Sequence, residues 1–246
     1  MRILAFDTAT PATAVALSGP GSVVVTARHD PRPGERPGHA TRLLPLVSKV
    51  FERARIGWSD VDRIAVGVGP GTFTGLRIGI ATARALAHAR DIPLVGVSTL
   101  ESLALAGSRA SLRREDPLPP ELDVALGVID ARRGEVFAAS WRIDEAEEFE
   151  NALLLPRALA PEALSELVAP LGPRTLAVGN GAIAFREVLE RSSALVPEQD
   201  SELHRVTATN HCKLARGLTG EAPEQVTPCY LRLPDAEIAR RTTHKP

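Results

Sequence analysis

Hydrophobic residues in the first hundred positions follow strand-like and helix-like spacing in turn. Short runs rich in Val, Ala, Ile and Leu predict strands, and apolar residues repeating every three to four positions predict helices. The predicted strands are residues 2–7, 13–17, 22–28, 63–68 and 93–97, and the predicted helices are residues 40–55, 74–89 and a segment from residue 99. The predicted order is therefore β-β-β-α-β-α-β-α.

Residues 107–121, GSRASLRREDPLPPE, are polar, charged and rich in proline, so we expect them to lie outside any core. After them the first pattern partly repeats. The predicted strands are residues 123–130, 135–143, 152–155 and 175–178, and the predicted helices are residues 161–169, 183–191 and 208–217. This predicts an N-terminal lobe at 1–106, a linker at 107–121 and a reduced C-terminal lobe with its tail at 122–246, related by duplication.

The segment 67–79, GVGPGTFTGLRIG, joins a predicted strand to a predicted helix and holds five glycines. Gly69 and Gly71 permit a tight turn, and the Thr72 hydroxyl lies where a helix begins with unpaired N–H groups. The turn either holds an anion or packs against another backbone segment. It matches neither a Walker loop nor a dinucleotide fingerprint, because no Lys-Ser/Thr pair follows and the glycine spacing differs.

Composition narrows the classes of function. The 246 residues carry a formal charge of −1 and are 44% hydrophobic, which argues against binding nucleic acid by bulk charge alone. The two cysteines, Cys212 and Cys229, are too few for a structural zinc site, and we found no signal segment or long apolar run. We therefore expect a reduced, cytoplasmic protein that does not associate with a membrane.

Three strands followed by alternating helix and strand form a ribonuclease H-like unit. Two such units in tandem resemble the α/β fold of the actin, sugar kinase and Hsp70 (ASKHA) superfamily. Within that superfamily the chain resembles the TsaB (YeaZ) family. The resemblance rests on ILAFDTATPATAVAL, HATRLLPLV, GVGPGTFTGLRIGIATARALA, GVSTLESLA, DARRGEVFAA and PCYLRLPDAE, which occur in both halves.

The resemblance implies a function in making N6-threonylcarbamoyladenosine beside the anticodon of tRNA. It implies a non-catalytic subunit that pairs with a TsaD-like paralogue and supports recruitment of a TsaE-like ATPase. It also implies a homodimer when the chain is alone, and contact with tRNA within the complex. The alternative from the same superfamily is an ATP-dependent phosphotransferase or carbamoyl-transfer enzyme.

Asp7 ends the first predicted strand, where the superfamily places its first phosphate-contacting carboxylate. It either coordinates magnesium near phosphate oxygens or caps its own turn. In the second half Asp130 corresponds to it, but Arg132 and Arg133 stand where small residues are expected. The candidates for residual nucleotide or phosphate contacts are Asp7, Thr8, Gly69, Gly71, Thr72 and Asp130. We expect no catalytic residue and no cofactor.

His39 begins a helix at which the TsaD paralogue carries a metal-binding His-x-x-x-His pair. Here the fourth residue on is Leu43, so one ligand of that pair is missing. The chain also lacks an H-E-x-x-H motif. We therefore expect no metal site, and the third candidate function, a metallopeptidase, has no motif to support it.

The helices at 40–55 and 74–89 have apolar sectors wider than a single sheet covers. The surplus either is covered within the domain or forms an intermolecular patch. The candidate interface residues are Leu43, Val47, Val50, Gly75, Gly79, Thr82 and Leu86. Most basic clusters are typical of solvated faces, and those of the linker and the tail are alternatively local tRNA contacts. The clusters are Arg109, Arg113 and Arg114 in the linker, Arg132 and Arg133 in a turn, and Arg240, Arg241 and Lys245 in the tail.

Overall fold

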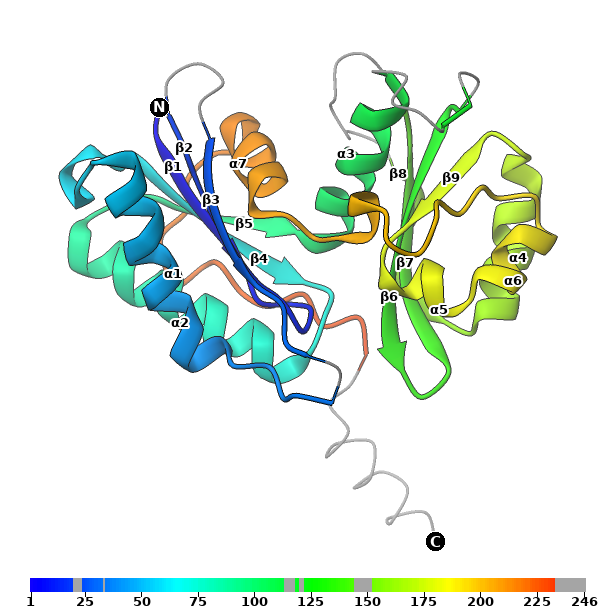
Figure 1. Ribbon diagram of the computed structural model, residues 1–246, viewed down its shortest axis with the longest axis horizontal. Helices are drawn as coiled ribbons and strands as arrows, with labels where there is room; N and C mark the ends of the chain where they lie inside the picture. The colour runs from blue at the N-terminus through cyan, green and yellow to red at the C-terminus, as the bar shows by residue number, and fades with distance from the viewer. Residues whose placement is uncertain (20–23, 33, 113–117, 120–121, 144–151, 233–246) are drawn as a thin grey trace, which may run out of the picture.

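Two β-sheets, each with helices on its faces, form two lobes (Figure 1). The structure, a computed structural model, describes residues 1–19, 24–32, 34–112, 118–119, 122–143 and 152–232. The strands of the first lobe are β1 (Ile3–Asp7), β2 (Thr13–Ser18), β3 (Val24–His29), β4 (Arg63–Gly69) and β5 (Leu94–Ser98). Those of the second are β6 (Val124–Arg132), β7 (Glu135–Arg142), β8 (Ala152–Leu159) and β9 (Thr175–Val178). All nine lie where the sequence predicts strands, although β8 is longer than expected.

The first sheet has the strand order β3-β2-β1-β4-β5. β2 runs antiparallel to β1 and β3, whereas β4 runs parallel to β1 and β5. Every residue of β1 and β2 is buried, which explains their nearly continuous apolar sequence. This order confirms the predicted ribonuclease H-like unit.

Helices α1 (His39–Ala54) and α2 (Phe73–Arg90) cover the outer face of the first sheet (Figure 1). Leu43, Val47 and Val50 of α1 enter the same core cluster as Ile80 and Ala83 of α2. Both helices end at a residue in the left-handed conformation, as helices commonly do.

The second sheet has the order β8-β7-β6-β9, which repeats the first four positions of the first sheet. Within the described residues this sheet has four strands, and next to β9 there is an isolated parallel bridge between Leu176 and Leu195. Its outer face is covered by α4 (Pro161–Val168) and α6 (Arg186–Arg191), and α5 (Asn180–Ala184) follows β9. Short 3-10 helices occupy Trp58–Asp60, Ala169–Leu171 and Glu202–His204. The second lobe is therefore a reduced copy of the first.

The two inner helices are exchanged between the halves of the chain. α3 (Thr99–Leu112) follows the first sheet in sequence but packs mainly on β6 of the second. α7 (Ala208–Gly217) comes late in the sequence but packs on β1 and β2. Residues 107–121 were predicted to separate two lobes that pack independently. This prediction is wrong, because each sheet is covered by a helix from the other half of the chain.

The prediction that all of residues 107–121 lie outside the core is also wrong. α3 continues through residues 107–112, where Ser108, Ala110 and Ser111 are buried. Gly107 lies against Leu176 and Val178 of the second sheet. These small residues allow the helix to approach the sheet closely although their polarity is typical of a linker.

Residues 221–232 form a strap that returns to the first lobe. Glu221 bridges to Leu94 on β5, Val226 enters the core, and the Cys229 N–H donates to the Val68 carbonyl at 2.8 Å. The Arg84 guanidinium holds the strap by donating to the carbonyls of Glu224 and Val226. The family-like PCYLR segment is thus fixed beside the beginning of α2.

Candidate functional site

Asp7 is fully engaged by groups of the chain itself. It ends β1 and is 1% exposed. Its Oδ1 accepts from the Ala9 N–H at 2.8 Å, and its Oδ2 accepts from the Thr99 hydroxyl at 3.0 Å. His211 Nε2 lies 3.0 Å from the same Oδ2. The carboxylate therefore joins β1 to the first residue of α3 and to the middle of α7.

Burial by itself would raise the pKa of Asp7. The hydrogen bond and charge of His211, together with the Ala9 and Thr99 hydrogen bonds, outweigh burial and lower the pKa below its ordinary value. The other ring nitrogen of His211, Nδ1, faces the Thr207 carbonyl at 3.1 Å. Both ring nitrogens of His211 therefore face acceptors within the chain.

His211 was not predicted from the sequence as a site residue. A signal was present, since Ala208, Cys212 and Ala215 form an apolar stripe on α7 and His211 lies within it. A polar residue on a buried stripe needs a partner. That partner is 204 positions away in the sequence, which is why local pattern does not identify it.

The glycine segment packs against the loop after β1. The Thr8 hydroxyl donates to the Gly75 carbonyl at 2.7 Å, and the Thr72 N–H donates to the Ala9 carbonyl at 2.8 Å. A Cβ at Gly71 or Gly75 would overlap the carbonyl oxygens of Ala9 and Thr8 respectively. Of the two uses left open for this turn, backbone packing is therefore the one realised.

Two other glycines of the segment, Gly67 and Gly69, have different structural roles. A Cβ at Gly67 would overlap Oδ2 of Asp7, so glycine at this position leaves room for the carboxylate. Gly69 has φ +103° and precedes a cis peptide bond to Pro70. Gly69 lies against the Leu76 side chain of α2 and the Cys229 carbonyl of the strap, so it contacts both elements.

Asp130 lies near the end of β6, in the place in the second sheet that Asp7 has in the first. Its Oδ1 accepts from the Arg132 N–H at 2.8 Å, and its side chain is 25% exposed. The following turn holds Arg132, Arg133 and Gly134 at φ 65°, 57° and 74°. Asp130 thus supports a hairpin turn in which two arginines adopt a conformation more usual for glycine.

Comparison with known proteins now identifies the family. Residues 35–239 match the model of the family TsaD, tRNA N6-adenosine threonylcarbamoyltransferase. The tRNA threonylcarbamoyladenosine biosynthesis protein TsaB of Escherichia coli is 34% identical over 241 residues, which cover 94% of this chain and 95% of that protein. The chain belongs to the TsaB family.

Solved structures agree with this assignment to the TsaB family. YeaZ from Pseudomonas aeruginosa superimposes with a TM-score of 0.71 at 31% identity, covering 94% of this chain and 99% of that one. A second Pseudomonas aeruginosa structure, described as similar to peptidase YeaZ, gives a TM-score of 0.74 at the same identity and coverage. Among the described residues of this TsaB family member, no helix is both long and apolar enough to cross a bilayer.

His39 is buried inside this TsaB family chain and contacts a neighbouring strand. It is 3% exposed, and its Nδ1 lies 2.8 Å from the Thr13 hydroxyl. Burial lowers its pKa, which keeps the ring neutral. Leu43, one turn further, is in the core, and the described part of the chain has no group of three His, Cys, Asp or Glu residues arranged for a metal. The residues here do not fit a metal centre.

Five of the seven predicted interface residues are buried within this TsaB family chain. Leu43, Val47 and Val50 are at most 3% exposed in the core under α1. Gly75 and Gly79 face inward, since a Cβ on either would overlap Thr8. Their assignment to a partner surface is wrong, because a helical wheel shows where apolar residues gather but not which neighbour covers them. Thr82 and Leu86 are half-buried and stay predictions.

Proposed function

We propose that this chain is a non-catalytic subunit in the biosynthesis of threonylcarbamoyladenosine in tRNA. It acts beside a TsaD-like transferase, supports recruitment of a TsaE-like ATPase, and works in the cytoplasm. The observation that carries the proposal is its 34% identity to a relative named for this biosynthesis over nearly the whole of both chains. The engagement of Asp7 supports a non-catalytic subunit, because its two oxygens already accept from three groups of the chain.

The alternative function, an ATP-dependent transferase, would use Asp7 and Asp130 around magnesium. Both acids lie at the ends of corresponding strands, as that enzyme requires. A metal at Asp7 Oδ2 would compete with the Thr99 hydroxyl and His211, and a metal at Asp130 Oδ1 would compete with the Arg132 N–H. We therefore propose that the chain works without a resident nucleotide or metal. Robust ATP turnover by the purified chain, abolished by Asp7→Asn, would establish the alternative.

The decisive experiment is reconstitution. The chain is combined with the TsaD-like protein, the TsaE-like ATPase and the threonylcarbamoyl-adenylate synthase of the same organism. Formation of the modified adenosine is measured with and without this chain. We expect the rate to fall to background when the chain is left out, and an unchanged rate would overturn the proposed function.

The outward side of α1 and α2 is the surface we propose for the TsaD-like partner, and for a second copy when the chain is alone. Leu44 on α1 is 51% exposed. On α2, Ala81 and Ala85 are exposed, and Ile78, Thr82 and Leu86 are half-buried beside them. Small side chains at 81 and 85 allow a second helix to approach closely. This outward set replaces the buried residues as the candidate interface.

We expect the double substitution Leu44→Arg with Ala85→Arg to abolish pairing, because it would place two charges without partners in the contact. Both positions are exposed, so the free energy of unfolding should change by less than about 1 kcal/mol. Sedimentation measures the homodimer, and co-purification measures the TsaD-like complex. Leu167→Arg on α4, which is 42% exposed, is the matched control and should pair normally. Normal pairing by the double variant would rule out this surface.

A further inference from the structure

Four arginines and two aromatic residues gather at one edge of the molecule, where β4 and β6 end and α2 begins. We call this set the arginine edge. Its members are Phe73, Arg77, Arg132, Arg133, Tyr230 and Arg232. The group comes from α2, the β6–β7 turn and the strap, three segments far apart in sequence.

Ring contacts, a hydrogen bond and an ion pair hold these segments together. The Phe73 and Tyr230 rings lie 5.3 Å apart, and the Arg77 guanidinium stands 3.7 Å from the centre of the Phe73 ring. Arg77 Nε also donates to the Tyr230 hydroxyl at 3.2 Å. Two residues after Tyr230, Arg232 pairs with Glu135 at 2.6 Å, directly after the β6–β7 turn. Two residues of extended chain span about 7 Å, so the aromatic cluster and the hairpin turn are neighbours.

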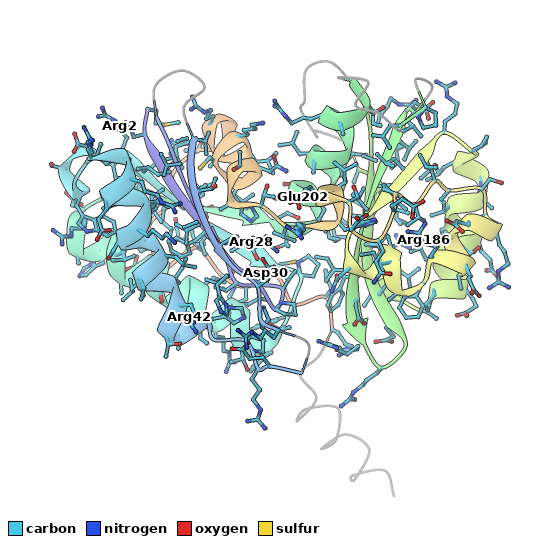
Figure 2. All side chains as sticks on the ribbon, viewed as in Figure 1. Arg2, Arg28, Asp30, Arg42, Arg186 and Glu202 are labelled. Atoms are coloured by element: carbon cyan, nitrogen blue, oxygen red, sulfur yellow. The ribbon has the colours of Figure 1, made fainter. Side chains whose placement is uncertain are left out.

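The arginine edge presents positive charge to solvent. Arg77 is exposed, and the Arg132 side chain is 68% exposed. Two acids offset part of this charge, since the Arg132 guanidinium lies 3.7 Å from Asp130 Oδ2 and Arg232 pairs with Glu135. Four arginines against two acids leave a formal excess of two positive charges at the edge. The first lobe adds exposed Arg42 in the first turn of α1, and Figure 2 shows Arg42 on the lower side of that lobe. Because the whole chain carries only −1, this positive charge is a local concentration.

The chemistry of the edge fits RNA better than an acidic protein. Guanidinium groups bind phosphate oxygens through paired hydrogen bonds. Tyr230 is 42% exposed, and an exposed ring beside arginines can stack on an unpaired base, a contact that an acidic peptide does not offer.

We propose that the arginine edge binds the tRNA substrate within the assembled complex. Arg132 and Arg133 contact backbone phosphates, and Tyr230 stacks on an unpaired base. This inference rests on the proposed function, and it adds that the non-catalytic subunit itself holds part of the substrate. Arg77 is a positioning residue, because it packs on Phe73 and orients the Tyr230 hydroxyl.

The test measures binding of a transcribed tRNA that reads codons beginning with A to the reconstituted complex over a series of salt concentrations. For Arg132→Ala with Arg133→Ala we expect affinity to fall roughly tenfold or more. The slope of log K against log salt should fall in magnitude by about 1.4–1.8, or 0.7–0.9 for each lost phosphate contact. Tyr230→Ala should weaken binding at least about fivefold with the slope unchanged, because stacking releases no counterions.

The matched control is Arg142→Ala with Arg191→Ala. It removes the same charge at the opposite end of β7 and at the end of α6. The proposal is overturned if Arg132→Ala with Arg133→Ala binds tRNA with the affinity and slope of this control. It is also overturned if the wild-type complex binds no tRNA, or if that variant loses the TsaD-like protein, since the edge would then be a protein contact. Dependence of modification on the wild-type chain is measured separately, so failure of the proposed function is distinguishable.

Discussion

Replacing Asp7 with alanine should lower the free energy of unfolding by about 3–5 kcal/mol, the usual cost of removing one partner of a buried ion pair. The substitution leaves the Ala9 N–H, the Thr99 hydroxyl and the His211 ring without their acceptor in the interior. Urea denaturation followed by circular dichroism measures the loss. Glu202→Ala is the control, because Glu202 pairs with Arg205 but is 75% exposed (Figure 2). It should cost less than about 1 kcal/mol.

The contribution of Asp7 to the free energy of unfolding should decrease at low pH. Its pKa in the folded protein lies below the ordinary value of about 3.9, so the ionised carboxylate contributes stability above that pH. That contribution is lost as the pH falls through the lowered pKa. The difference between wild type and Asp7→Ala should therefore be full near pH 6 and shrink below about pH 4. A cost for Asp7→Ala no larger than that for Glu202→Ala at pH 6 would contradict the buried pair.

Gly75→Ala should be the second strongly destabilising change, at about 3 kcal/mol or more. A Cβ at this position would overlap the Thr8 carbonyl oxygen and the Thr72 hydroxyl, and the first is backbone that cannot rotate away. The loop after β1 must then move, and with it the Ala9 N–H that holds Asp7. The usual gain of about 1 kcal/mol from replacing a helical glycine is too small to offset this. The midpoint of urea unfolding measures the change.

Gly217→Ala provides the matched control for Gly75→Ala. Gly217 is the last residue of α7, and nothing lies within 4 Å of a Cβ built on it. We expect no loss of stability there, or a gain of up to about 1 kcal/mol. If Gly75→Ala unfolds at the same urea concentration as Gly217→Ala, the close packing of α2 on the β1 loop is wrong.

Local pattern was sufficient for the strands, for most helices and for their order, although the single helix predicted at 183–191 is divided into α5 and α6. Buried strands such as β1 are short apolar runs, and helices such as α1 carry a repeating apolar face, so each is visible within a few residues of sequence. The sheet that each helix covers is not visible in this way. α3 and α7 each have an apolar face, but the sheet that covers it is formed by residues far away in the sequence.

Local sequence pattern also does not show which distant residues meet at the site, and this explains which site residues could be predicted. Asp7 was a candidate because it lies at the end of a strand. Its buried partner His211 comes from a segment 204 positions later in the sequence. Gly75 and Gly79 indicate that something approaches α2 closely. Sequence does not say what approaches, and in the structure it is Thr8 of the same lobe.

The exchange of α3 and α7 also has a consequence for synthesis on the ribosome. The first sheet is complete in sequence when β5 ends at Ser98, yet α7, which covers its inner face, ends at Gly217. At roughly 5–20 residues per second, the nascent chain carries an uncovered apolar sheet for on the order of ten seconds. In the first part of that interval, until β9 ends at Val178, α3 lacks its complete sheet as well. A chaperone that shields such surfaces on emerging chains would therefore meet this protein before α7 leaves the exit tunnel.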